Sequence, residues 1–119
     1  MTRVAIPSST NLTISVDQLG KDAVVRLTGR VDVDSSPDLR DRLRTLLSQE
    51  ALPEIIVDLA GVSYIETSGI ATLIEALRIA RHRQTNFRLQ GLSGAGLRLF
   101  EVTGMLALFE ASGSGQKVS

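Results

Sequence analysis

Residues 55–59, Ile-Ile-Val-Asp-Leu, restrict the fold more strongly than any other segment of the chain. The run is short, rich in β-branched residues and nearly all apolar, which predicts a central strand with both faces covered. Two helical apolar stripes flank it: Leu39, Leu43, Leu46 and Leu47 before it, and Ile70, Leu73, Ile74 and Leu77 after it. A central strand between two amphipathic helices predicts an α/β layer architecture.

Further strands and one more helix extend this pattern in both directions. The other predicted strands are residues 13–19, 23–28, 87–89 and 106–109. The first two should form a hairpin around Gly20, and a third helix should run from Ser93 to about Thr103, with Gly104 as its C-terminal cap. The predicted order is ββαβαβαβ, in a mixed, mostly parallel sheet of about four or five strands. Right-handed crossovers place the first two helices on the same side of this sheet.

The first helix carries a start signal that is readable in the sequence. Ser35 or Ser36 is expected to cap it, with Pro37 in its first turn and Asp38 at a capping-box spacing from Ser35. Pro53 closes the segment. A well-marked helix therefore separates the hairpin from the central strand.

The length of 119 residues favours a single domain. We expect residues 12–111 to form this domain, since they contain every periodic segment. Residues 1–11 are polar and irregular, which predicts a flexible N-terminal lead. Residues 112–119, Ser-Gly-Ser-Gly-Gln-Lys-Val-Ser, predict a flexible C-terminal tail.

Composition excludes several classes of function. The chain has no cysteine and one histidine, His82, which rules out thiolate chemistry and zinc sites built on several His or Cys ligands, so no metal or other cofactor is expected. Thirteen basic residues balance thirteen acidic ones, so the basic footprint of a nucleic-acid-binding protein is absent. There is no signal-peptide pattern and no apolar run long enough to cross a membrane. These features predict a cytoplasmic protein without direct membrane insertion.

The most informative stretch is residues 57–70, Val-Asp-Leu-Ala-Gly-Val-Ser-Tyr-Ile-Glu-Thr-Ser-Gly-Ile. A buried strand ends, Gly61 marks a loop, and Thr67 and Ser68 stand at the start of a helix. One interpretation is that Thr67 or Ser68 simply caps the helix. Another is that the helix N-terminus accommodates a phosphate on one of these hydroxyls, which would add about −1.5 to −2 charges beside Glu66.

Residues 57–70 resemble the signature of STAS domains, in particular of bacterial anti-sigma factor antagonists. In that signature an apolar strand and a short loop lead to Asp-Ser-Ser-Gly or Asp-Ser-Thr-Gly at a helix start. Residues 27–32, Leu-Thr-Gly-Arg-Val-Asp, resemble the family segment before the first helix, and residues 97–105 resemble its closing helix. The resemblance covers roughly residues 13–110, and three separated motifs agree with the family pattern in their order and spacing.

The resemblance implies a protein that acts by binding and not by catalysis. In the family, an anti-sigma factor that is also a serine kinase phosphorylates the first hydroxyl after the acidic residue. The unphosphorylated antagonist binds this kinase and releases the sigma factor, and a phosphatase, expected here to be of the PP2C type, reverses the modification. By position the phosphorylation site is Thr67, with Ser68 as second choice. The implied partner-binding residues are Asp32, Glu66, Thr67, Ser68, Gly69 and Ile70. ATP and magnesium would belong to the partner kinase.

Two departures from the family pattern leave an alternative open. Glu66 stands where aspartate is usual, and Thr67 where serine is usual. The β-branch of threonine narrows its rotamer choice, which matters to a kinase specialised for serine. The alternative function is therefore a non-phosphorylated STAS accessory subunit that binds a membrane transporter or another regulatory complex. An enzyme is a weaker hypothesis, because no set of nucleophile, base and electrophile is visible.

Two other clusters have ordinary structural interpretations. Gly91, Gly94 and Gly96 precede a helix without the G-x-G-x-x-G spacing of a dinucleotide site, which predicts a turn and a helix start. Arg78, Arg81, His82 and Arg83 gather in the last turns of the second helix. Basic side chains at that position complement the negative end of the helix dipole.

Overall fold

A computed structural model describes residues 2–7, 11–49, 52–111 and 116–117, with backbone only for the first and last of these segments and for Leu19, Glu110 and Ala111. Within them one sheet contains β1 (Thr2–Pro7), β2 (Leu12–Leu19), β3 (Asp22–Val31), β4 (Glu54–Ile65), β5 (Asn86–Gln90) and β6 (Gln116–Lys117). The helices of the described residues are α1 (Ser36–Ser48), α2 (Thr67–His82), α3 (Gly94–Val102) and α4 (Leu106–Ala111).

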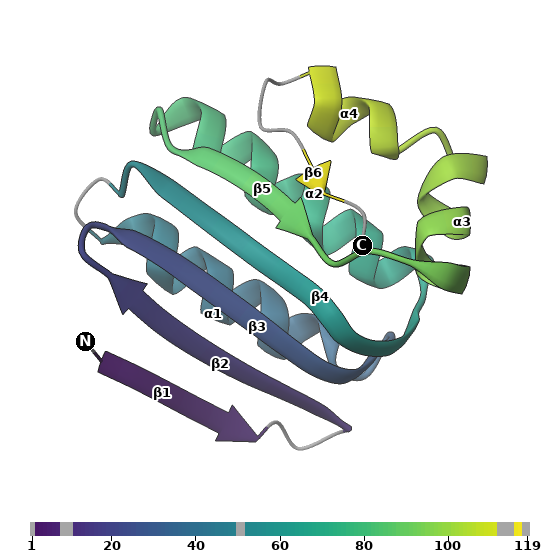
Figure 1. The fold of residues 1–119 in the computed structure, drawn as a ribbon, viewed down its shortest axis with the longest axis horizontal. Coiled ribbons are helices and arrows are strands. Elements are labelled where there is room, and N and C mark those ends of the chain that lie inside the picture. Colours follow the sequence, from purple (N-terminus) through teal and green to yellow (C-terminus); the bar gives the residue numbers. More distant parts are fainter. Residues whose placement is uncertain (1, 8–10, 50–51, 112–115, 118–119) are drawn as a thin grey trace.

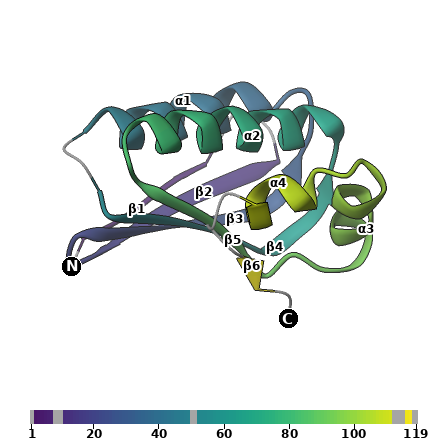
Figure 2. The same cartoon turned by 90° about the horizontal axis from the view of Figure 1, so that it is seen from above.

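The strands lie in the sheet in their sequence order, from β1 to β6 (Figure 1). Strands β1, β2 and β3 pair antiparallel, whereas β3, β4, β5 and β6 pair parallel. Helix α1 connects β3 to β4 and α2 connects β4 to β5, and both helices cover the same side of the sheet (Figure 2). The predicted α/β class, the hairpin and the common side of the two helices are confirmed.

The main core lies between this side of the sheet and the two helices. Alternate residues of β2 and β3, such as Ile14 and Leu27, are buried there, and so is the predicted leucine stripe of α1. Val57 of β4 pairs with Val25 of β3 and Leu89 of β5, and all three side chains are buried. The sequence periodicity therefore identified the faces that meet in the core.

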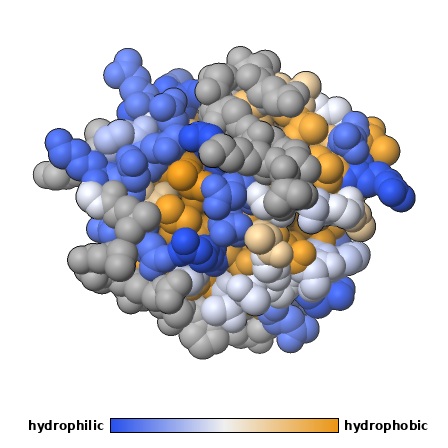
Figure 3. Space-filling view, viewed as in Figure 1, coloured by the Kyte–Doolittle hydropathy of each residue, from blue (hydrophilic) through white to orange (hydrophobic). Residues whose placement is uncertain are grey.

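The opposite face of the sheet corrects one prediction. Residues 55–59 do form a central strand, but on this face Ile56 is only half-buried. Arg26 lies between two carboxylates there, in ion pairs with Asp17 and, at 3.7 Å, with Asp58. Figure 3, which looks at this face, shows hydrophilic residues around small apolar areas. Flanking long side chains, and not a helix of the described residues, give the strand its partial cover on this face.

Three segments differ from their predicted structure. Residues 106–109 form part of α4 and not a strand, because the helix turns Phe109 inward against Phe87 and Phe100, at centroid distances of 6.3 and 6.1 Å. Part of the expected N-terminal lead is strand β1, whose backbone pairs with β2. In the expected C-terminal tail, residues 116–117 form β6 beside β5, and the rest of both terminal segments lies outside the described residues.

The third helix begins and ends as predicted. Ser93 is the N-cap of α3, and the backbone of Gly104, directly after the C-cap, has a positive φ of 74°. Gly91 and Gly94 also have positive φ values, of 75° and 59°, which agrees with a turn before a helix start. The glycine-rich segment is therefore explained by backbone conformation.

Irregular pairing at the carboxyl ends of β3 and β4 shapes the candidate site. The predicted loop at Gly61 is wrong, because β4 continues to Ile65 after register shifts opposite β3. The backbone of Gly29 in β3 has a φ of +112°, and a Cβ atom there would collide with the carbonyl oxygen of Asn11. The extension pairs Arg30 with Tyr64 and brings the starts of α1 and α2 to the same end of the sheet (Figure 1).

Candidate functional site: two adjacent helix starts

The starts of α1 and α2 lie next to each other, although they are separated by about thirty residues in the chain (Figure 2). The hydroxyls of Ser36, at the start of α1, and Ser68, in the first turn of α2, share a hydrogen bond over 3.3 Å. Each helix start contains two consecutive hydroxyl residues, but the structure uses the two pairs differently.

At the start of α1, both hydroxyls are buried and hydrogen-bonded. The side chain of Ser35 is fully buried and donates to the carbonyl oxygen of Arg30, over 2.8 Å, while accepting the N–H of Asp32, over 2.9 Å. The hydroxyl of Ser36 donates to the carbonyl oxygen of Asp32, over 2.6 Å. Ser35 is the N-cap residue, but the predicted capping box with Asp38 is wrong, because the Ser35 hydroxyl bonds to the preceding loop and not to the helix N–H groups.

At the start of α2, Thr67 is left free. The N-cap residue is Glu66, so the structure does not support the interpretation that Thr67 or Ser68 caps the helix. The carbonyl oxygen of Glu66 accepts the N–H of Gly69, over 3.0 Å, as the helix begins. Thr67 is exposed, and its hydroxyl makes no hydrogen bond with a described residue. A hydroxyl in this position is accessible from outside the protein.

The residues after Thr67 become progressively more enclosed. Ser68 is half-buried, and its hydroxyl shares a hydrogen bond with the hydroxyl of Ser36. Gly69 is buried, and a Cβ atom there would lie 2.5 Å from Cγ1 of Val31. The side chain of Ile70 is only 3% exposed. In the free protein, Gly69 allows the helix to pack closely against β3, and Ile70 belongs to the core; their contacts with a partner stay a prediction.

Beside Thr67, five residues form a connected group that we call the Glu66 cluster: Arg30, Asp32, Val33, Tyr64 and Glu66. The Glu66 carboxylate accepts the backbone N–H of Val33 and the hydroxyl of Tyr64, both over 3.0 Å. The guanidinium of Arg30 lies over the Tyr64 ring at 4.2 Å from its centroid, and its Nε is 3.7 Å from the Asp32 carboxylate. These contacts join the loop after β3 to the residues immediately before α2.

Two pKa values in this cluster are shifted by its hydrogen bonds. The backbone N–H of Ser35, which donates to the carboxylate, lowers the pKa of Asp32, and the Ser35 hydroxyl, the N–H of Asp34 and the charge of Arg30 act in the same direction. The hydrogen bond to Glu66 raises the pKa of Tyr64, because ionised Tyr64 would lose a donor and face a carboxylate. Asp32 is therefore held as an anion and Tyr64 as a neutral donor.

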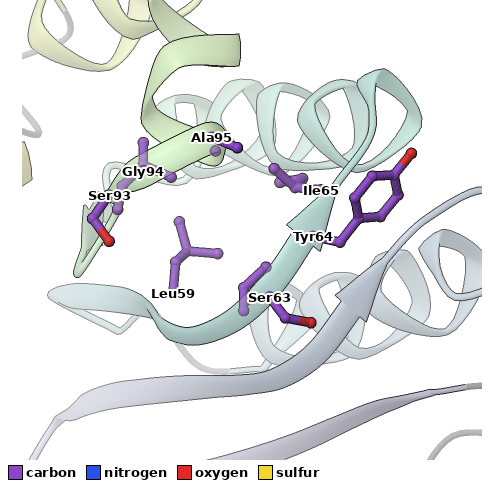
Figure 4. A pocket seen from close by; sticks show the side chains of 10 residues that line it. Leu59, Ser63, Tyr64, Ile65, Ser93, Gly94 and Ala95 are labelled. Atoms are coloured by element: carbon purple, nitrogen blue, oxygen red, sulfur yellow. The ribbon is translucent and has the colours of Figure 1, made fainter.

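A pocket of about 240 Å³ lies on the other side of this β4 extension, against the start of α3 (Figure 4). Its lining residues are Leu59, Val62, Ser63, Tyr64, Ile65, Leu92, Ser93, Gly94, Ala95 and Gly96. In Figure 4 the ring of Tyr64 points away from the wall formed by Ser93 and Ala95, and the Ser63 hydroxyl donates to the carbonyl oxygen of Gly29. The pocket is a mainly apolar depression next to the Glu66 cluster.

The basic residues near the end of α2 lie apart from this site. Arg78, Arg81, His82 and Arg83 are exposed, and the Arg83 guanidinium donates to the carbonyl oxygen of Gln49 over 3.1 Å. The described ranges contain no group of three or more His, Asp or Glu side chains placed to hold a metal ion. In the same ranges, every helix is too short or too polar to cross a membrane. The candidate site thus consists of the hydroxyls at the two helix starts and the Glu66 cluster with its carboxylates, Arg30 and two exposed apolar side chains.

The sheet order, the two helices on one side and the paired helix starts define an α/β fold of the STAS type. A family model described as "Mlab, STAS domain" matches residues 14–110, and the chain belongs to this family. The anti-sigma-B factor antagonist of Bacillus subtilis (strain 168) is 28% identical over 106 residues, which cover 89% of this chain and 95% of that protein.

Solved structures of related fold agree. The crystal structure of an anti-sigma factor antagonist from Mycobacterium paratuberculosis superimposes with a TM-score of 0.76 at 19% identity, covering 87% of each chain. The structure of the Bacillus cell fate determinant SpoIIAA in its phosphorylated form superimposes with a TM-score of 0.68 at 19% identity, covering 89% of this chain and 90% of that one.

Sequence reasoning placed Thr67, Ser68, Asp32 and Glu66 near one another, and the structure does bring them to the same end of the sheet. It did not find Arg30, Val33 or Tyr64. A signal for Tyr64 was present in the sequence, because it is the single tyrosine of the chain and lies two residues before Glu66, on the same face of an extended strand. The contact between Val33 and Glu66 had no local signal, because it joins residues 33 positions apart.

Proposed function

We propose that this protein is an anti-sigma factor antagonist whose binding to an anti-sigma factor, a serine/threonine kinase, is controlled by phosphorylation of Thr67. The observation that carries the proposal is the exposed Thr67 hydroxyl, which has no hydrogen-bond partner in the described part of the chain, at the first residue of α2. The names of the relatives support the antagonist role, since they include anti-sigma-B factor antagonists. A fold neighbour, SpoIIAA, has been solved in a phosphorylated form.

Thr67 is the preferred acceptor among the four hydroxyls at the two helix starts. A kinase must bring its catalytic residues and the γ-phosphate of ATP to the acceptor oxygen, which requires an accessible hydroxyl. Ser35 and Ser36 are 0% and 4% exposed, and Ser68 is half-buried beside Ser36. Phosphorylation of Ser35 or Ser36 would first require this region to open, and Ser68 is less accessible than Thr67.

The electrostatics of the site explain how one phosphate would act as a switch. The free N–H groups and the dipole of α2 accommodate an anion at Thr67, so the phosphorylated protein should keep its fold. The phosphate adds about −1.5 to −2 charges directly beside Glu66 and close to the Asp32 anion. A partner surface that fits a neutral threonine would then meet a hydrated dianion, and binding would be lost.

In this mechanism, the unphosphorylated protein binds the kinase and thereby releases the sigma factor. Phosphorylation of Thr67 by the bound kinase ends the interaction, and a phosphatase, of the PP2C type in our proposal, restores it. ATP and magnesium are bound by the kinase, while this chain supplies the acceptor hydroxyl and the surface around it. The protein would thus act by binding in the cytoplasm, without a cofactor of its own.

The test pairs the protein with an anti-sigma factor kinase of the same organism, in the presence of ATP and magnesium. Intact mass is followed for the wild type, Thr67→Ala and Ser68→Ala. We expect one phosphate on the wild type and on Ser68→Ala, and none on Thr67→Ala. A phosphate that remains on Thr67→Ala would overturn the assignment. Tight binding without phosphate on any variant would instead favour the non-phosphorylated accessory subunit of a transporter or another regulatory complex.

A further inference from the structure

We propose that Val33 is an apolar anchor that inserts into a pocket of the protein partner docking beside Thr67. This inference rests on the proposed function for the identity of the docking face, and it adds the residue that the partner binds in a pocket. Four large apolar side chains are notably exposed among the described residues: Val33 (66%), Tyr64 (40%), Val102 (73%) and Leu108 (36%). Two of them, Val33 and Tyr64, belong to the Glu66 cluster, whereas the other two lie on α3 and α4.

Hydrogen bonds fix the backbone around Val33 and hold its side chain outward. Its own N–H donates to Glu66 over 3.0 Å, and the N–H groups of Asp34 and Ser35 donate to the Asp32 carboxylate over 3.1 and 3.0 Å. The fully buried Ser35 hydroxyl also bonds to the Asp32 N–H and to the Arg30 carbonyl oxygen, on the inner side of this loop. Because the loop is fixed at both sides of Val33, the valine is ordered before a partner arrives, which lowers the entropy cost of binding.

The surroundings of Val33 specify the chemistry of the partner. Exposed Asp34 and the carboxylates of Asp32 and Glu66 lie around Val33, and Arg30, which pairs with Asp32, is the one basic residue of the cluster, so acidic groups outnumber basic ones around the valine. A complementary surface has an apolar pocket for the valine and basic or N–H donor groups around its rim. Scattered single apolar side chains need no partner to explain them, but an apolar side chain held rigidly inside an acidic loop beside the modifiable hydroxyl is a different case.

The same geometry couples the anchor to phosphorylation. Glu66 precedes Thr67 in the chain, and its carboxylate holds the N–H of Val33. A phosphate on Thr67 would repel this carboxylate and weaken its hold on the Val33 loop. Phosphorylation would thus loosen the anchor as well as add charge to the docking face.

The experiment measures binding of the full-length protein to the immobilised anti-sigma kinase, in the presence of a non-hydrolysable ATP analogue. The variants are Val33→Asp, Val33→Ala and Val102→Asp. Val102 is the matched control, because it is also an exposed valine and lies on α3, outside the Glu66 cluster. We expect Val33→Asp to weaken binding by about tenfold or more, Val33→Ala by a few-fold, and Val102→Asp by less than about twofold.

The outcomes separate this inference from the proposed function. If the wild type binds and Val33→Asp binds equally well, Val33 is not an anchor, while the antagonist role stands. If Val102→Asp weakens binding as much as Val33→Asp, the effect is one of overall charge and the inference also fails. If the wild type does not bind the kinase at all, the proposed function and the inference are both overturned. The thermal unfolding midpoint of each variant is measured as a control for loss of the fold.

Discussion

Helices α1 and α2 begin side by side at the same end of the sheet, each with two hydroxyl residues, but they are anchored in different ways. The start of α1 is tied down by its serines, since Ser35 and Ser36 are both buried and bonded to the preceding loop. The start of α2 is fixed by packing and backbone contacts: Gly69 lies against Val31, and the Glu66 N–H donates to the Val31 carbonyl oxygen over 2.9 Å. A helix start that is fixed without its first hydroxyl leaves that hydroxyl available for regulation.

The largest stability effect should come from disturbing the packing that holds the start of α2. In Gly69→Ala, the new methyl group would lie 2.5 Å from Cγ1 of Val31, so the helix or β3 must shift. We expect a loss of up to about 3 kcal/mol in the free energy of unfolding, despite the higher helix propensity of alanine. Chemical denaturation measures this difference.

Gly96 in α3 is the matched control for that substitution. A Cβ atom there meets Ile65 and Leu92 only at 3.3 and 3.4 Å, which small side-chain movements relieve. We expect Gly96→Ala to remain within about 1 kcal/mol of the wild type. If Gly69→Ala is as stable as Gly96→Ala, close packing does not anchor the start of α2, and the contrast between the helix starts disappears.

A smaller effect should separate the hydroxyls themselves. Ser35→Ala removes the partner of the Arg30 carbonyl oxygen and of the Asp32 N–H in a buried position, and we expect it to cost about 1–2 kcal/mol. Thr67→Ala removes an exposed hydroxyl that bonds to no described residue, and we expect a change within about 0.5 kcal/mol. Both values come from urea unfolding curves. Equal losses in the free energy of unfolding for the two variants would mean that the Thr67 hydroxyl has a structural role and is not free for modification.

The smallest effect concerns the charge at the junction of the two helix starts. Glu66→Gln removes the carboxylate that raises the pKa of Tyr64, so this pKa should fall toward the ordinary tyrosine value of about 10. The chain has one tyrosine and no tryptophan, so phenolate absorbance titrates Tyr64 alone. Asp41→Asn on the exposed side of α1 is the control and should leave the titration unchanged. A Tyr64 pKa that is the same in Glu66→Gln and wild type would contradict the hydrogen bond.

The sign of the related stability change follows from the direction of this shift. The folded protein binds the Tyr64 proton more tightly than the unfolded chain does, because its pKa is raised. The contribution is complete below a pH of about 10, the unfolded pKa, and is lost as pH rises through the folded pKa. As pH rises from about 10 through the folded pKa of Tyr64, the free energy of unfolding should therefore fall less in Glu66→Gln than in the wild type.

Much of the fold was readable because its signals are local. The apolar stripes of α1 and α2, the hairpin of β2 and β3, and the start of α3 at Ser93 all depend on patterns within one segment. The misassigned segments depend on distant partners. Residues 106–109 are apolar enough for a strand, but contacts of Phe109 with Phe87 and Phe100 stabilise a helix instead. Short apolar runs do not by themselves distinguish the two structures.

For the candidate site, the sequence by itself determined the chemistry. It placed an acidic residue and two hydroxyls before an apolar helix, and it excluded cysteine and multi-histidine sites. Only the tertiary structure decided which groups are free. The hydrogen bonds between Ser36 and Ser68 and between Val33 and Glu66 join residues 32 and 33 positions apart. Side-chain burial and pairing depend on which segments the sheet brings together, and a pattern within one segment contains no record of that.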